Sequence, residues 1–98
     1  MTMRVVVSYD VETTTKDGRR RLRRVAKACK GYGVRAQYSV FECSVGSVEL
    51  VSLRAALLKI IDPAHDSLRI WHVSEDDARK TEHYGVREPL DVDGPLLF

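Results

Sequence analysis

Asp10 is an acidic residue at the end of Arg4–Asp10, an apolar, β-branched segment that predicts a short buried strand. By itself this single carboxylate holds Mg²⁺ poorly and does not indicate a nuclease. Such ions are usually held by one or two carboxylates with waters and phosphate oxygens, so one Asp10 makes a poor site. Two copies paired about a two-fold axis near this strand end could share one metal between two Asp10 side chains. The alternative is that Asp10 caps or turns the following loop, and the residues alone favour neither interpretation.

Four further residues have side chains of types that can bind phosphate. The hydroxyl of Tyr9 could position a phosphate, although a tyrosine in a strand is more often a core residue. Arg19 and Arg21 follow at the start of a predicted helix, where the positive end of the helix dipole favours an anion. Arg35 is isolated from other bases and is either a phosphate ligand or half of an inter-strand ion pair.

The patterns of several other chemistries are missing from the sequence. It contains no G-x-S-x-G, Walker A or G-x-G-x-x-G spacing. Cys29 and Cys43 form no metal or redox motif, and we expect both to be buried and reduced. The histidines His65, His72 and His83 are spread along the chain, so we expect structural rather than catalytic roles for them.

The charge of the chain is polarised, although its net value is only +2. The segment Lys16–Lys30 holds eight basic residues against one acidic residue, Asp17, a net charge of +7. The segment Glu75–Phe98 holds seven acidic residues against three basic ones, a net charge of −4. Arginines at this density are typical of a surface that binds nucleic-acid phosphates. The alternative is a solvated helix face.

The basic segment has the pattern of an amphipathic helix. After a polar loop, Glu12–Gly18, apolar side chains recur at helical spacing on one face, while bases repeat the same spacing on another. The apolar face is Leu22, Val25, Ala26 and Cys29, and the basic face is Arg20, Arg23, Arg24 and Lys27. Gly31 is expected to end the helix in the left-handed conformation.

The remaining elements follow from the hydrophobic pattern. In Val34–Val45 the apolar side chains change from even to odd positions, which predicts a break near Ser39–Phe41 and hence two short strands or one bent strand. A second helix is expected from Ser47, its candidate N-cap, with a buried stripe that ends before Asp62-Pro63. That stripe is Leu50, Leu53, Leu57 and Ile60.

The C-terminal third predicts one clear strand and a less regular end. Ser67–Val73 reads as a strand, Ser74–Thr81 as a charged connection, and Glu82–Val86 as a short last strand. The chain ends on apolar residues, so we expect the segment from about residue 82 to 98 to be docked, on a second subunit or on its own domain.

The element order predicts a single α+β domain over residues 1–98, a ferredoxin-like βαββαβ sandwich with an additional C-terminal strand or tail. A chain of 98 residues has a modest core, which makes a homodimer plausible. No apolar run approaches the roughly 20 residues that cross a bilayer, and the N-terminus lacks a secretory cleavage pattern. We therefore expect a cytoplasmic protein with no membrane partner.

Several segments together resemble the CRISPR-associated Cas2 family: Val5–Val11, the basic helix, Gly33–Glu42 and Asp66–Trp71. The similarity covers nearly the whole chain, and its most specific parts are Tyr9-Asp10 and the segment Gln37–Glu42. The ending Pro95–Phe98 resembles that of subtype I-C members.

The resemblance implies a ferredoxin-like homodimer with an Asp10 from each subunit at the interface, holding one Mg²⁺ or Mn²⁺. Family members have been assigned metal-dependent endonuclease activity on single-stranded RNA or double-stranded DNA. The family's proposed active-site positions correspond here to Tyr9, Asp10, Arg19, Arg21, Arg35 and Phe41.

The resemblance also implies a role in acquiring new CRISPR spacers. In this family the dimer bridges two dimers of the Cas1 integrase and holds DNA along its basic surface, so Cas1 and DNA or RNA are the expected partners. Two alternatives remain: a purely architectural DNA-binding scaffold without nuclease activity, and a toxin-type endoribonuclease of the same fold.

Overall fold

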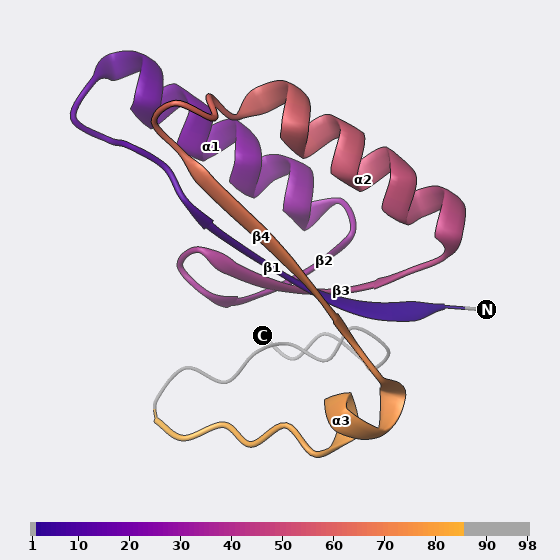
Figure 1. The fold of residues 1–98 in the computed structure, drawn as a ribbon. Helices are drawn as coiled ribbons and strands as arrows, with labels where there is room; N and C mark the ends of the chain where they lie inside the picture. The colour runs from indigo at the N-terminus through magenta and orange to yellow at the C-terminus, as the bar shows by residue number, and fades with distance from the viewer. Residues whose placement is uncertain (1, 86–98) are drawn as a thin grey trace.

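A computed structural model describes residues 2–85, which form one antiparallel sheet with helices on both sides (Figure 1). The elements are β1 (Met3–Asp10), α1 (Lys16–Lys30), β2 (Gly33–Gln37), β3 (Val40–Val45), α2 (Ser47–Ile60), β4 (Ser67–Val73) and α3 (Glu75–Arg79). The strand order is β2-β3-β1-β4, and every neighbouring pair is antiparallel. This is the predicted α+β ferredoxin-like arrangement.

The β-branched segment forms the central strand because it can bury one face along its whole length. In β1 the side chains of Val5, Val7 and Tyr9 are buried and face the helices, while the residues between them face the other side of the sheet. β1 pairs with both β3 and β4, and its last residue, Asp10, lies opposite Ser67. The candidate metal ligand therefore stands at the end of the most firmly held strand.

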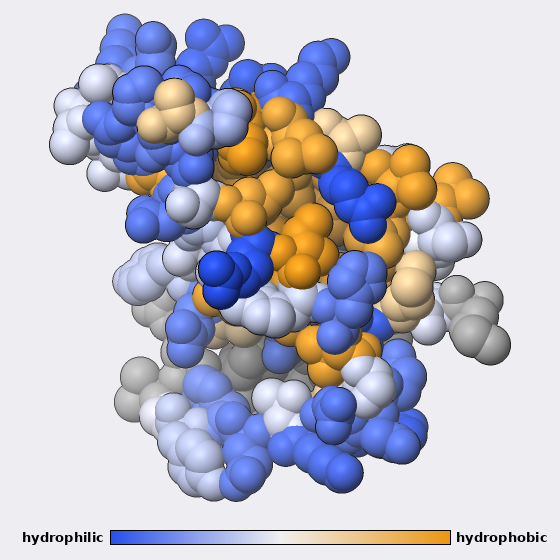
Figure 2. Space-filling model, viewed as in Figure 1, coloured by the Kyte–Doolittle hydropathy of each residue, from blue (hydrophilic) through white to orange (hydrophobic). Residues whose placement is uncertain are grey.

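α1 and α2 cover the same face of the sheet, and their apolar stripes complete the core. Val25 and Cys29 of α1 are fully buried, and Leu50, Leu53 and Leu57 of α2 are buried as predicted. In Figure 2, hydrophilic side chains gather over the outside of α1, whereas apolar ones lie over α2. The apolar surface of α2 includes exposed valines and a leucine: Val48, Val51 and Leu58.

The helix ends differ in detail from the sequence prediction. α1 begins at Lys16 rather than after Gly18, because the Thr15 hydroxyl accepts a hydrogen bond from the Gly18 N–H at 3.0 Å and so caps an earlier turn. The prediction of a left-handed Gly31 is wrong, because its φ of −70° is that of a right-handed helical residue. The N-cap of α2 is Gly46 rather than Ser47, and the Gly46 N–H donates to Glu49 Oε1 at 2.9 Å.

The predicted break in Val34–Val45 is confirmed as a hairpin. β2 and β3 are joined by a turn at Tyr38–Ser39, and their pairing shifts register between Arg35 and Gln37. That irregularity and the turn account for the change of apolar phase in the sequence. The hairpin is anchored to the central strand, because the Tyr9 N–H donates to the Ser39 carbonyl at 3.1 Å.

The segment expected to be a charged connection contains the short helix α3, on the opposite side of the sheet from α1 and α2. The Ser74 hydroxyl caps it by accepting the Asp77 N–H at 3.0 Å. The strand expected over Glu82–Val86 does not form in residues 82–85, and Val86 and the tail from 86 to 98 lie outside the described residues. Within residues 2–85, no helix has the length and apolar character to cross a bilayer.

Candidate active site

Three of the predicted site residues meet across three adjacent strands at one end of the sheet. Tyr9 of β1 stacks on Phe41 of β3, with ring centroids 6.3 Å apart, and the Arg35 guanidinium of β2 lies 5.2 Å from the Phe41 ring centroid. Phe41 is fully buried and Tyr9 nearly so, whereas Arg35 is exposed. The two rings thus form a rigid support that presents the charge of Arg35 to solvent.

In this arrangement the Tyr9 side chain packs in the core, and its hydroxyl bonds to the protein backbone rather than being open to a phosphate. Its hydroxyl donates a hydrogen bond to the carbonyl of Tyr38, at 3.3 Å, and so ties the hairpin tip to the central strand. Burial and the nearby Cys29 raise the pKa of Tyr9, while Arg35 opposes the shift. The hydroxyl therefore stays protonated at neutral pH.

Asp10 is exposed, and its carboxylate has no hydrogen bond or ion pair within residues 2–85. The loop-capping alternative is not what these residues show, because Thr15 supplies the cap of α1. Asp10 lines two grooves, one on each side of the end of β1. The first, of about 580 Å³, runs along β4 and includes Arg69 and Trp71. The second, of about 430 Å³, lies between α1 and the β2–β3 hairpin and includes Arg35.

Residues 2–85 of one chain can contribute to a divalent-metal site but do not complete one. Among residues 2–85 no cluster of three or more histidine, cysteine or acidic side chains could hold a metal ion. The exposed Asp10 carboxylate is a hard oxygen ligand of the kind that Mg²⁺ and Mn²⁺ prefer. Ligands in addition to Asp10 would have to come from outside residues 2–85, for example from a second copy of the chain, from water or from phosphate oxygens.

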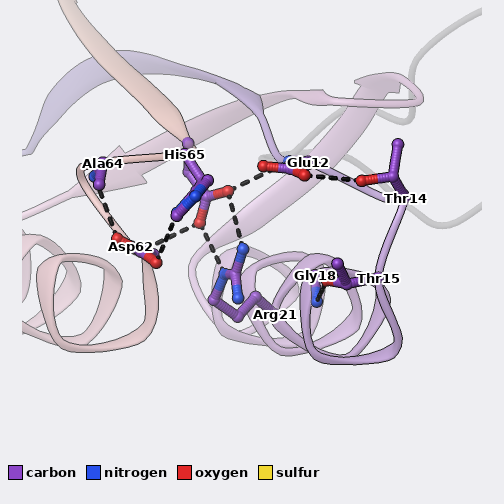
Figure 3. Close-up of polar contacts among 9 residues, drawn as sticks. Glu12, Thr14, Thr15, Gly18, Arg21, Asp62, Ala64 and His65 are labelled. Atoms are coloured by element: carbon purple, nitrogen blue, oxygen red, sulfur yellow. Dashed lines mark hydrogen bonds and ion pairs between the residues drawn. The ribbon is translucent and has the colours of Figure 1, made fainter.

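The two arginines at the start of α1 are placed differently from Arg35. Arg21 forms an ion pair with Asp66, in which its Nε donates to Oδ2 at 2.8 Å and its Nη2 to Oδ1 at 3.3 Å (Figure 3). Arg19 donates from Nη1 to the Thr13 carbonyl at 3.1 Å and is exposed. Neither lines a groove that contains Asp10.

Asp66 organises this end of the molecule and was given no role by the sequence analysis. It accepts backbone N–H groups from Glu12 at 3.1 Å and from Asp62 at 2.8 Å, in addition to both bonds from Arg21. It therefore joins the loop after β1 to α1 and to the end of α2. The hydrogen bond from Arg21, supported by the backbone donors, lowers the pKa of Asp66 to about 2 against the cost of its burial.

A signal for this pair was present in the sequence. Arg21 precedes Val25 and Cys29 at a spacing of four, so it belongs to the inward face of α1 and not to the basic outer face. A charged residue on a buried face needs a partner, and the residues alone do not show that the partner comes from 45 positions downstream.

The predicted basic face of α1 is present in the structure. The side chains of Arg20, Arg23, Arg24 and Lys27 are all exposed. Arg23 also lines the second groove, opposite Arg35. These residues give α1 the electrostatic properties of a nucleic-acid-binding surface.

No cysteine or histidine lines either of the two grooves around Asp10. Cys29 and Cys43 are buried and free, as predicted; burial is the main cause that raises the pKa of their thiols to about 12 and about 11. His65 pairs with Asp62 at 2.9 Å, which raises the pKa of the histidine and lowers that of the aspartate.

The sequence is similar to one known protein family and to several of its members. The family described as CRISPR associated protein Cas2 matches residues 3–81. A CRISPR-associated endoribonuclease Cas2 of Chlorobaculum tepidum is 50% identical over 96 residues, covering 98% of this chain and 100% of that protein. A CRISPR-associated endonuclease Cas2 of Halalkalibacterium halodurans is 47% identical over 96 residues, with the same coverage of 98% and 100%.

The fold agrees with a solved relative as well. The crystal structure of Streptococcus pyogenes Cas2 superposes with a TM-score of 0.77 at 48% sequence identity, covering 85% of this chain and 100% of that chain.

Proposed function

Because the chain belongs to the CRISPR-associated Cas2 family, we propose that it is a metal-dependent endonuclease that hydrolyses phosphodiester bonds in single-stranded RNA or double-stranded DNA in the cytoplasm. Two relatives that match nearly its whole length carry the names endoribonuclease and endonuclease. The observation that carries the proposal is the exposed Asp10 carboxylate at the mouth of two grooves, one of which also presents Arg35.

The residues of the chain take distinct parts in this chemistry. Asp10 would hold Mg²⁺ or Mn²⁺, and the bound ion would supply polarisation of the phosphodiester and a lowered pKa of a water molecule. Arg35 neutralises phosphate charge from its place over Phe41. Tyr9 and Phe41 keep Arg35 and the hairpin in register with β1, and are positioning residues.

The arginines of α1 act at a greater distance from the reacting atoms. Arg21 is a positioning residue, because its guanidinium is committed to Asp66 and so fixes the loop that follows Asp10. Arg19 supports the same loop through Thr13 and remains accessible to a phosphate. Its charge attracts the substrate backbone.

A homodimer completes the metal site. Among the described residues that line the two grooves, Asp10 is the single exposed carboxylate of one chain, whereas a two-fold pair with the β1 ends together supplies two. Two carboxylates that face each other repel unless a cation lies between them, so the pair and the metal support each other. In such a pair the two Asp10 side chains would hold one ion together.

The test is cleavage of labelled RNA and duplex DNA with and without Mg²⁺ or Mn²⁺. Asp10→Asn removes the ligand charge, keeps the shape and alters no hydrogen bond within residues 2–85, so it should abolish cleavage while leaving the circular dichroism spectrum unchanged. Asp76→Asn, at an exposed ion pair with Arg79, is the matched control and should keep full activity. Equal cleavage by Asp10→Asn and wild type, from preparations freed of contaminating nuclease, contradicts the proposal.

A second function is favoured by the separate basic surface of α1. Its exposed bases include several that line neither groove beside Asp10, so they can hold DNA without serving the reaction. We propose that this surface carries DNA in a complex with the Cas1 integrase during spacer acquisition. The architectural role predicts that Asp10→Asn supports acquisition in cells, whereas Arg20→Glu with Arg24→Glu abolishes it. Acquisition that survives the charge reversals contradicts this role.

A further inference from the structure

The groove between α1 and the β2–β3 hairpin combines apolar walls with two opposed bases. Leu22 and Ala26 of α1 line one side and are continuous with the core. Arg23 projects from the same helix, and Arg35 stands across from it on β2. A site with a flat apolar surface and cations at its margin suits a nucleobase joined to a phosphate.

Tyr38 adds an aromatic ring at the tip of the hairpin. Tyr38 is 77% exposed, and it lines the same groove. The hairpin tip is held by its backbone, because the Tyr38 carbonyl accepts the Tyr9 hydroxyl and the Ser39 carbonyl accepts the Tyr9 N–H. The ring is therefore presented from a fixed base, as a stacking platform requires.

The size of the groove selects what can enter it. A volume of about 430 Å³ lies within the range of small-ligand sites, roughly 300–1,000 Å³, and is far too small for a duplex. A base can reach the aromatic ring only if it is unpaired and turned out of its stack. The groove thus suits one nucleotide of a single strand.

We propose that this groove is a subsite for one unpaired nucleotide, whose base stacks on Tyr38 against Leu22 and Ala26 and whose phosphate lies between Arg23 and Arg35. Asp10 lines the same groove, so the adjoining phosphodiester lies beside the candidate metal ligand. That placement rests on the proposed nuclease function, whereas binding of the nucleotide does not. Ribose and deoxyribose share the base and phosphate chemistry, so RNA and DNA strands are tested separately.

The test measures binding in the presence of a chelator, without cleavage. Single-stranded RNA and DNA carrying one 2-aminopurine are titrated with protein, since stacking on an aromatic ring quenches that fluorophore. The wild type should quench it. Tyr38→Ala should lose the quenching and bind roughly tenfold more weakly, whereas Tyr38→Phe keeps both. The Tyr9 hydroxyl bonds the backbone of residue 38, so Tyr38→Ala preserves the hairpin anchor.

Matched controls separate stacking from general effects. Tyr84→Ala removes another tyrosine, 82% exposed, from outside the groove and should change nothing. Arg23→Gln should weaken binding more than Arg24→Gln, because both bases are exposed on α1 and only Arg23 lines the groove. A sugar–phosphate strand that is abasic at every position and a blunt duplex should each bind wild type and Tyr38→Ala equally.

Equal quenching and affinity for wild type and Tyr38→Ala would overturn the subsite. So would an equal loss of affinity for the normal strand, the abasic strand and the duplex. If the wild type quenches as expected but cleaves neither RNA nor DNA with any metal, the subsite stands and the nuclease proposal fails.

Discussion

The Asp66 carboxylate joins three segments through two backbone N–H groups and the Arg21 guanidinium. Its side chain is fully buried, while that of Arg21 keeps 18% exposure. In Asp66→Asn, the two backbone N–H groups and the Arg21 guanidinium would face a neutral amide, which accepts fewer hydrogen bonds than a carboxylate. We expect Asp66→Asn to lower the free energy of unfolding by about 2–3 kcal/mol, below the roughly 3–5 kcal/mol typical of a broken buried pair because Arg21 regains solvent. Urea denaturation measures the change, and Asp76→Asn should show a much smaller one.

The same carboxylate makes stability depend on pH in a defined direction. Its folded-state pKa is lowered from 3.8 to about 2, so the folded protein binds this proton less readily than the unfolded chain. The contribution is complete above about pH 4 and is lost as the pH falls through about 2. The difference in unfolding free energy between wild type and Asp66→Asn should therefore shrink over that window. A difference that stays constant, or grows on acidification, contradicts the assignment.

At this scale, some roles could be read from the sequence and others could not. The position of Asp10 at a strand end followed from the β-branched run before it, and burial of Cys29 and Cys43 followed from the apolar pattern. The different roles of the arginines could not be predicted from the sequence. Arg21 and Arg35 differ in what lies opposite them, Asp66 and Phe41, and both partners are distant in sequence.

At the scale of elements, the two glycines that flank Tyr32 make opposite predictions. A Cβ on Gly33 would lie 2.2 Å from the Glu42 carbonyl oxygen and 2.7 Å from Cys43, so β2 and β3 must separate to admit it. A Cβ on Gly31 meets only the Ala28 carbonyl oxygen, at 3.4 Å, and the backbone there is right-handed.

We expect Gly33→Ala to cost about 1–3 kcal/mol of unfolding free energy through overpacking. Gly31→Ala should be neutral or stabilising by up to about 1 kcal/mol, since it reduces the freedom of the unfolded chain. Thermal and urea denaturation of both variants measures these changes in unfolding free energy. Equal stability of the two would show that the approach of β2 to β3 is not a tight one.

The basic face of α1 predicts the salt dependence of binding. Each phosphate contact contributes about 0.9 to the slope of log affinity against log salt for duplex DNA. Arg24→Glu should therefore weaken DNA binding and flatten the slope by about one. Lys59→Glu makes the same change in net charge on α2, from an exposed position, and should leave the slope nearly unchanged. Equal effects of the two reversals would show that overall charge, rather than α1, governs binding.

The element order was predictable because period-two and period-3.6 patterns are local. The phase change in Val34–Val45 even located the hairpin turn. The ends of helices were less predictable, since Thr15, Gly46 and Ser74 compete with neighbours of similar capping ability. The helix α3 was missed because its five residues, four of them charged, carry no apolar stripe.

At the scale of the whole molecule, the near-neutral net charge conceals a basic helix beside a candidate metal site, to which residues 2–85 contribute the exposed Asp10 carboxylate. The ferredoxin-like order of strands brings the end of β1, the hairpin tip and the start of β4 to one end of the sheet. That convergence of segments distant in sequence produces both grooves around Asp10. It depends on topology, which the motifs alone do not specify.

In the proposed endonuclease site, two copies of Asp10 hold one metal between them. Mixing the wild type with Asp10→Asn under conditions that exchange subunits tests it directly, by metal-dependent cleavage as a function of the wild-type fraction. If both carboxylates are needed, activity follows the square of that fraction, and an equal mixture retains about a quarter of the wild-type rate. If each subunit acts alone, activity falls linearly and about half remains, which contradicts the account.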